Sequence, residues 1–175
     1  MRYIGLFVTV VIIFVIITKD TLAAPLYQRE SLQGVDKLAV LVEDIPNDLT
    51  EAGLDKYQLE VDTELKLRLA KIAITGTDEP VPFLQDLYVQ VSGIKMGEVG
   101  YAYGVVVSFK QPVVLMSSPG VVCIAVTWSS SRIGYFGSRA TGTIVEKIRG
   151  VVKDIVDEFI NDYLAARQEL NKEQK

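Results

Sequence analysis

The chain has 175 residues, of which 49% are apolar and 23% are charged, so its composition is that of one globular domain and excludes a disordered chain. It contains no histidine, and its only cysteine is Cys123. These counts exclude Ser-His-Asp and Cys-His triads, histidine general bases, internal disulfides, and zinc sites built on His or on several Cys. Any enzyme of this sequence would have to use carboxylates, Lys, Tyr, Ser or Arg, and we assign no catalytic residue, metal ligand or cofactor.

The N-terminus has the three-part pattern of a secretory signal peptide. Residues 4–18 carry no charge and follow Arg2, and the small residues Ala23 and Ala24 come shortly after them. A helix of that length spans about 22 Å, less than the roughly 30 Å core of a bilayer. We expect residues 1–23 to be cleaved on export to the periplasm or the exterior. The alternative is an uncleaved inner-membrane anchor formed by residues 4–18. No cysteine follows the apolar run, which excludes lipid attachment at a bacterial lipobox.

The remaining chain is mildly acidic. Without residues 1–23 it has 16 basic and 21 acidic residues, a net charge of −5. Because the charges are scattered and mostly acidic, the sequence predicts no basic patch that would bind nucleic acid or an anionic membrane surface. We expect a polar linker over residues 24–34, a single domain over 35–168 and a charged tail over 169–175.

The first half of the domain predicts a strand, a helix and a short strand. Residues 37–43 form a short apolar run, and Asp55 with Gln58 has the spacing of a helix cap, so a helix should begin near Lys56. Apolar residues at steps of three or four predict its buried face: Tyr57, Val61, Leu65, Leu69 and Ile72. Residues 72–75 predict a strand and residues 76–82 a loop.

The second half predicts antiparallel strands and a long helix. Residues 83–95 and 101–109 alternate with a period of two, and residues 121–128 are apolar on both faces, so we place the last run centrally. A further hairpin is expected around residues 133–136. The capping box of Thr143 and Glu146 predicts a helix to about Arg167. Its predicted buried stripe comprises Ile144, Ile148, Val151 or Val152, Ile155, Phe159, Tyr163 and Leu164. The fold class is a two-layer α+β domain with a mixed, mostly antiparallel sheet of about five strands and two helices on one face.

One segment is difficult to explain by packing alone. Residues 128–139 hold the only Trp together with Ser, Arg and Tyr side chains just ahead of a helix N-terminus, where free N–H groups favour an anion. The candidate ligand site for a phosphate or carboxylate comprises Trp128, Ser130, Arg132, Tyr135, Arg139 and Thr143. The alternative is an ordinary strand end whose Ser and Arg are solvated. The carboxylates of both helices are predicted to be solvated, among them Asp62, Asp154, Asp157, Glu158 and Asp162.

The order of elements resembles the small α+β modules of bacterial envelope proteins, such as the TolB N-terminal domain. The runs LEVDTELKLRLAKIAI, LYVQV, YAYGVVVSFKQPVVL and FINDYLAARQ are similar to those of a group of uncharacterised exported bacterial proteins. This resemblance implies bacterial origin, export and fold, and it adds no catalytic residue. Two functions remain open: a non-enzymatic module that holds a protein partner in the cell envelope, and a binder or enzyme for a small anionic ligand.

Overall fold

The computed structural model describes residues 26–75 and 85–173; the expected signal peptide over 1–23 and the expected loop over 76–82 lie outside them. Within the described residues, five strands form one sheet in the order β2-β1-β3-β4-β5. β1 pairs in parallel with β2 and β3, and the β3–β4 and β4–β5 pairs are antiparallel. The strands are β1 Lys37–Val42, β2 Ala73–Ile74, β3 Asp86–Lys95, β4 Gly100–Val114 and β5 Val122–Gly137.

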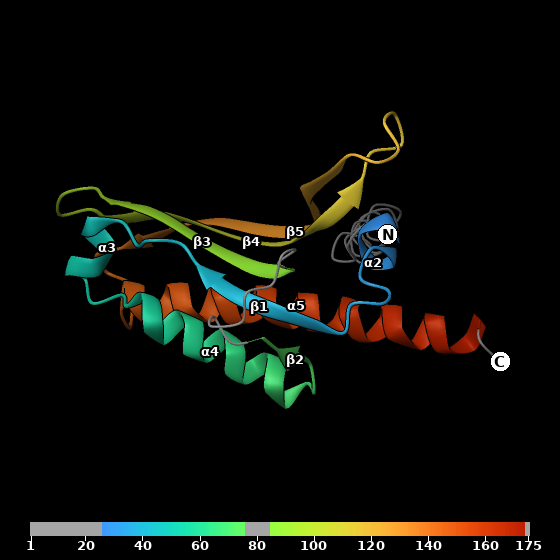
Figure 1. Ribbon diagram of the computed structural model, residues 1–175. Coiled ribbons are helices and arrows are strands. Elements are labelled where there is room, and N and C mark those ends of the chain that lie inside the picture. The colour runs from blue at the N-terminus through green and yellow to red at the C-terminus, as the bar shows by residue number, and fades with distance from the viewer. Residues whose placement is uncertain (1–25, 76–84, 174–175) are drawn as a thin grey trace, which may run out of the picture.

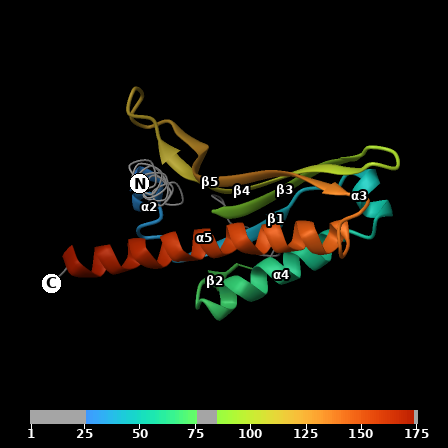
Figure 2. The same ribbon diagram turned by 180° about the vertical axis from the view of Figure 1, so that it is seen from behind.

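Helices cover one face of this sheet. α4 and α5 lie side by side beneath the strands, α3 lies at one end, and α2 lies near the other end beside the C-terminal half of α5 (Figures 1 and 2). The predicted two-layer α+β fold is therefore confirmed. The helices are α2 Leu26–Glu30, α3 Asn47–Glu51, α4 Lys56–Leu69 and α5 Ile144–Glu173.

Both predicted helix starts are confirmed. The Asp55 side chain accepts a hydrogen bond from the Gln58 N–H at 2.8 Å. At α5, Glu146 N–H donates to Thr143 Oγ1 at 3.1 Å, and Thr143 N–H donates to a Glu146 carboxylate oxygen at 2.9 Å. α5 continues beyond Arg167 to Glu173, because the expected tail contains good helix formers and no Gly or Pro to stop it.

The core lies between the sheet and α5. Alternate residues of β3 and β4 are buried against the helices, and the α5 stripe from Ile144 to Tyr163 is buried as predicted, whereas Leu164 is exposed. The ring of Phe159 lies at the centre, 5.6 Å from Phe109, 5.1 Å from Trp128 and 6.2 Å from Tyr163 between centroids.

The predicted position of the last strand is wrong. β5 is an edge strand, and it continues through residues 129–137 as one strand, without a further hairpin at 133–136. β5 continues as one strand because β4 is long: it offers 15 residues for pairing, and residues 106–108 of β4 pair with the Ser-rich segment 129–131 of β5. Residues 121–127 are apolar on both faces because they belong to an exposed hairpin, whereas Trp128 at the end of this run lies in the core.

The predicted buried face of α4 is also wrong. Tyr57, Val61, Leu65 and Leu69 are exposed, and the buried positions of the helix are Leu59, Thr63 and Leu67. Ile72 is buried as predicted, but it lies beyond the end of α4. The two sets are two residues apart, a rotation of about 200° at 3.6 residues per turn. The helix is turned this way because the polar positions between the two sets form ion pairs with α5, a partner that apolar periodicity does not reveal.

Residues 26–34 do not form a free linker. They contain α2, and Leu32 just after it is fully buried. Arg29 of α2 lies 3.4 Å from the Asp162 carboxylate of α5. Because this segment fills a gap between β5 and α5, it belongs to the domain.

Candidate functional site

The six residues predicted to bind an anion do not share one pocket. Trp128, Ser130 and Arg132 occupy alternate positions of β5, on the side that faces α5. Tyr135 lies on the open face, where its hydroxyl donates to the Val99 carbonyl at 2.5 Å. Arg139 follows the strand in an exposed turn, and Thr143 caps α5.

Most polar groups of the predicted site are engaged within the fold. The Arg132 guanidinium forms an ion pair with the Glu158 carboxylate, which also accepts a hydrogen bond from Ser130 at 2.7 Å. At the start of α5, Glu146 already accepts from the Thr143 N–H. A carboxylate of the chain thus occupies the position that favours an anion. Phosphate binding at this segment remains a prediction.

Trp128 belongs to a polar cluster that was not foreseen. Its side chain is buried, and its indole Nε1 donates to Asp162 Oδ2 at 2.9 Å. The other oxygen of Asp162 accepts the ion pair from Arg29. In the sequence, Trp128 itself could have indicated this cluster, because a buried indole N–H usually has a hydrogen-bond acceptor.

The same cluster extends to the base of the hairpin that connects β4 with β5. Gln111 Nε2 donates to Thr127 Oγ1 at 2.8 Å and to the Ser31 carbonyl at 2.9 Å. Ser31 Oγ donates to the Thr127 carbonyl at 3.2 Å. We call Arg29, Ser31, Gln111, Thr127, Trp128 and Asp162 the hairpin base. Because it joins α2, both strands and α5, it fixes the direction in which the hairpin leaves the sheet.

Beyond this base, residues 111–127 form what we call the apolar hairpin. A register shift between Phe109 and Lys110 interrupts the ladder, and the two strands bend away from α5 (Figures 1 and 2). No residue from Gln111 to Ser131 is charged. The exposed large apolar side chains of the apolar hairpin are Val114, Leu115, Met116, Val121, Val122, Ile124 and Val126.

The charged side chains nearest to the apolar hairpin on the open face of the sheet contact neighbouring side chains. Asp86 and Lys110 lie opposite each other on β3 and β4, and Lys110 Nζ lies 3.2 Å from the ring centroid of Tyr88. Burial raises the pKa of the Asp86 carboxyl, and the positive charge of Lys110 partly opposes that shift. This group marks the boundary between the sheet and the apolar hairpin.

The open face also has a shallow hollow of about 410 Å³ near the opposite end of the strands. Its lining is apolar or neutral: Ser92, Gly93, Ile94, Ala102, Tyr103, Gly104 and Ile133. Ile133 is 93% exposed beside it. With no charged group in its lining, this hollow fits an apolar side chain better than an ion.

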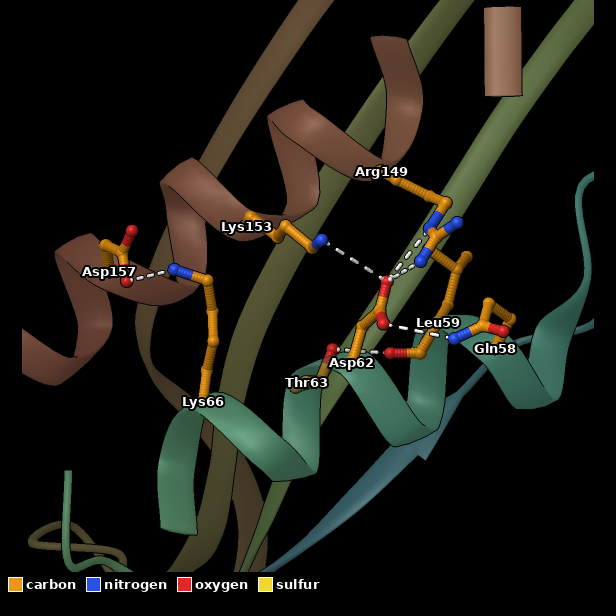
Figure 3. Close-up of polar contacts among 8 residues, drawn as sticks. All are labelled: Gln58, Leu59, Asp62, Thr63, Lys66, Arg149, Lys153 and Asp157. Carbon is orange, nitrogen blue, oxygen red and sulfur yellow. Dashed lines mark hydrogen bonds and ion pairs between the residues drawn. The ribbon is translucent and has the colours of Figure 1, made fainter. Parts of the chain in front are cut away.

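A second group of charges joins the two long helices (Figure 3). Asp62 of α4 accepts from Arg149 Nη2 of α5 at 2.7 Å and from Gln58 at 3.1 Å, and Lys153 lies 3.7 Å away. Lys66 forms a further ion pair with Asp157. We call these contacts the α4–α5 clamp. The expectation of solvated carboxylates is therefore wrong for Asp62, as it is for Glu158 and Asp162.

The clamp makes a prediction about stability. Burial raises the pKa of Asp62, but the hydrogen bonds from Arg149 and Gln58 and the charges of Arg149 and Lys153 outweigh it, so the pKa lies below its usual value of 3.8. Asp62→Ala should lower the free energy of unfolding by about 1.5–3 kcal/mol at neutral pH.

Because the pKa of Asp62 is lower in the folded than in the unfolded protein, its ionised carboxylate stabilises the fold at pH values above the ordinary Asp pKa. This stabilisation is lost as the pH falls through the pKa of Asp62 in the folded protein. Urea unfolding of wild type and Asp62→Ala at neutral and acidic pH measures the difference, which should shrink in acid. The control is Glu64→Ala, which breaks the more exposed pair with Arg68 and should change stability by less than about 1 kcal/mol. Equal losses in both variants would contradict the prediction.

Over 26–75 and 85–173, no group of three or more His, Cys, Asp or Glu side chains is placed to hold a metal ion. Within the same ranges, no helix is both long and apolar enough to span a bilayer.

The solved structures that resemble the chain include two bacterial lipoproteins of low sequence identity. No family model matches the chain, and no curated protein matches it. A minor lipoprotein from Acinetobacter baumannii has 11% identity and a TM-score of 0.38, covering 76% of this chain and 93% of its own. The rare lipoprotein B from Shewanella oneidensis has 13% identity and a TM-score of 0.26, covering 79% of this chain and 96% of its own. Both of these structures are described as bacterial lipoproteins, and neither is described as a TolB-type module.

Proposed function

We propose that the chain is an exported, non-enzymatic binding module of the bacterial cell envelope that holds a protein partner through the apolar hairpin. The observation that carries this proposal is the hairpin itself: a long uncharged segment that projects from the sheet with apolar side chains exposed on both strands. A soluble domain gains nothing from such a surface in isolation, and contiguous exposed apolar patches mark interaction sites.

The hairpin base supports a binding role. Gln111, Thr127 and Ser31 bond across the root of the hairpin, and Asp162 anchors Trp128 and Arg29 behind it. A recognition element held by such contacts loses less conformational entropy on binding than a free loop does. Arg132, Glu158 and Asp162 form ion pairs or hydrogen bonds inside the fold, so the exposed surface next to them is the uncharged hairpin.

The partner's chemistry follows from that of the hairpin. Val114, Met116 and Ile124 offer no charge and few hydrogen-bonding groups, so the complementary surface is an apolar groove with a polar rim. The exposed strands add backbone groups that a partner strand can pair with. We therefore expect a folded protein of the envelope, bound at the tip and flanks of the hairpin.

A photo-crosslinking amino acid at position 116 tests the proposal in cells that express the whole chain. We expect an adduct of one defined mass, and we expect Ile124→Asp in the same chain to remove it without changing the urea midpoint of unfolding. The matched control is the same crosslinker at position 133, which is equally exposed but lies on the open sheet face. Adducts of equal yield at both positions, or adducts with lipid alone, would overturn the proposal.

A further inference from the structure

The apolar hairpin has two backbone edges, and its pairing pattern shows which backbone groups point outward. In an antiparallel ladder, pairs of residues that exchange hydrogen bonds alternate with pairs whose N–H and C=O groups point away from each other. The Leu115 N–H donates to the Val121 carbonyl at 3.1 Å, so these two residues form the bonded pair that closes the hairpin. Along the ladder that follows, Val122, Ile124 and Val126 therefore direct their backbone groups away from β4.

The strand edges next to this stretch are closed or lack a donor. The β4 edge of the hairpin contains Pro112, which lies opposite Ile124 and has no N–H to offer a further strand. On β5, beyond the hairpin, the Ser31 hydroxyl donates to the Thr127 carbonyl at 3.2 Å. The next outward N–H of β5, that of Ser129, donates to a side chain of α2 at 3.5 Å. The segment around α2 thus closes the β5 edge where the hairpin joins the sheet.

The stretch of β5 that stays open has none of the features that protect strand edges. Soluble proteins interrupt such edges with a charged side chain, a proline or a bulge, or cover them with another element. Residues 121–126 contain no charge and no proline, and the register shift comes only after them. In the described part of the chain, the outward N–H and C=O groups of Val122, Ile124 and Val126 have no hydrogen-bond partner. We call these groups the free β5 edge.

We propose, building on the proposed function, that the protein partner binds by adding an extended segment as a further strand along the free β5 edge. Unpaired N–H and C=O groups in a row are a template for strand addition, and backbone hydrogen bonds are what such a contact supplies. An apolar side chain alone would not require the partner to be extended. The row of backbone groups therefore specifies the conformation of the segment that binds.

The side chains of the free β5 edge specify the composition of that segment. Val122, Ile124 and Val126 are 49%, 54% and 55% exposed, and they lie on one face of the hairpin because side chains alternate along a strand. A segment that pairs with their backbone extends this face, so it carries an apolar side chain at every second position. The segment is short, because Ser31 closes the edge at Thr127.

Proline substitutions test the free β5 edge in cells that express the whole chain with the photo-crosslinking amino acid at position 116. Each substitution removes one outward N–H and places a ring where the added strand would pair. Val122→Pro and Ile124→Pro should each lower the yield of the protein adduct at least about fivefold. The matched variant is Val114→Pro, which places the same ring on the β4 edge, opposite Val122, and should leave the yield unchanged.

Ile124→Val separates the backbone from the side chain, because it keeps the N–H and loses only one methyl group. It should keep the adduct, and all of these variants should keep the wild-type urea midpoint, since the hairpin lies outside the core. If Ile124→Val lowers the yield as much as Ile124→Pro does, the side chain carries the contact and the inference is wrong.

The remaining outcomes separate this inference from the proposed function. Equal yields in Ile124→Pro and Val114→Pro, whether lowered or not, would overturn strand addition at the β5 edge and leave the proposed function standing. An adduct of twice the mass of the chain would also overturn the inference, because the added strand would then come from a second copy. If the wild type forms no adduct at position 116, the proposed function and this inference are both wrong.

Discussion

Replacing Phe159 by alanine should lower the free energy of unfolding by about 3–5 kcal/mol. Phe159 is fully buried at the middle of α5, and its ring contacts those of Phe109, Trp128 and Tyr163. The alanine variant loses the transfer free energy of the ring and leaves a cavity between the sheet and the helix. Since a domain of this size has a total stability of about 5–15 kcal/mol, this single change removes a large share of it.

Trp128 provides the measurement, because it is the only tryptophan and is buried against Phe159. Its fluorescence should report urea unfolding, with a lower midpoint in Phe159→Ala and an unchanged slope. The matched control is Leu164→Ala on the same helix, which removes an exposed side chain and should change stability by less than about 1 kcal/mol. If both variants unfold at the same midpoint, Phe159 is not a principal core residue.

Elements whose patterns depend on local chemistry were predictable from the sequence. The caps of Asp55 and Thr143 depend on residues three apart in the chain, and the alternation within β3 and β4 depends only on which face meets the helices. The stripe of α5 is predictable for the same reason, since α5 buries its most apolar side.

Elements whose environment is set by distant residues were not predictable. α4 exposes its apolar ridge because Asp62 and Lys66 find partners on α5, about 90 residues further along the chain. The first part of β5, up to Trp128, is apolar on both faces, as a central strand is, but its neighbours place it at the edge. In both cases periodicity shows that one face is apolar without showing what covers it. An apolar face that folding leaves uncovered is informative in itself, because it indicates contact with another molecule.

The candidate site also combines features that the sequence indicates with contacts to distant residues that it does not indicate. The sequence singles out the neighbourhood of Trp128 and assigns the polar groups there to a ligand, which remains a prediction. In the structure Glu158 pairs with Arg132, and Asp162 accepts a hydrogen bond from Trp128. These carboxylates sit on the polar side of α5 by sequence, and only the position of β5 and α2 over that side buries them.

Replacing Asp162 by alanine should lower the free energy of unfolding by about 2–4 kcal/mol, the second largest effect we expect. Asp162 is buried, and its two oxygens accept from Trp128 Nε1 and pair with Arg29. The variant leaves a buried N–H without an acceptor and a half-buried guanidinium without its partner, and each loss is costly. The control Asp154→Ala, at an exposed position of the same helix, should change stability by less than about 1 kcal/mol.

The Trp128 hydrogen bond can be isolated by combining Asp162→Ala with Trp128→Phe, which removes the N–H donor and keeps an aromatic ring. Because the indole donor is already absent in the Trp128→Phe background, Asp162→Ala should cost about 1 kcal/mol less there than in wild type. Urea unfolding followed by circular dichroism gives all four free energies without relying on tryptophan fluorescence. The same variants should reduce the yield of the crosslink at position 116, because the hairpin base that directs the apolar hairpin loses the carboxylate that joins it to α5. Equal costs of Asp162→Ala in both backgrounds would contradict the coupling between Trp128 and Asp162.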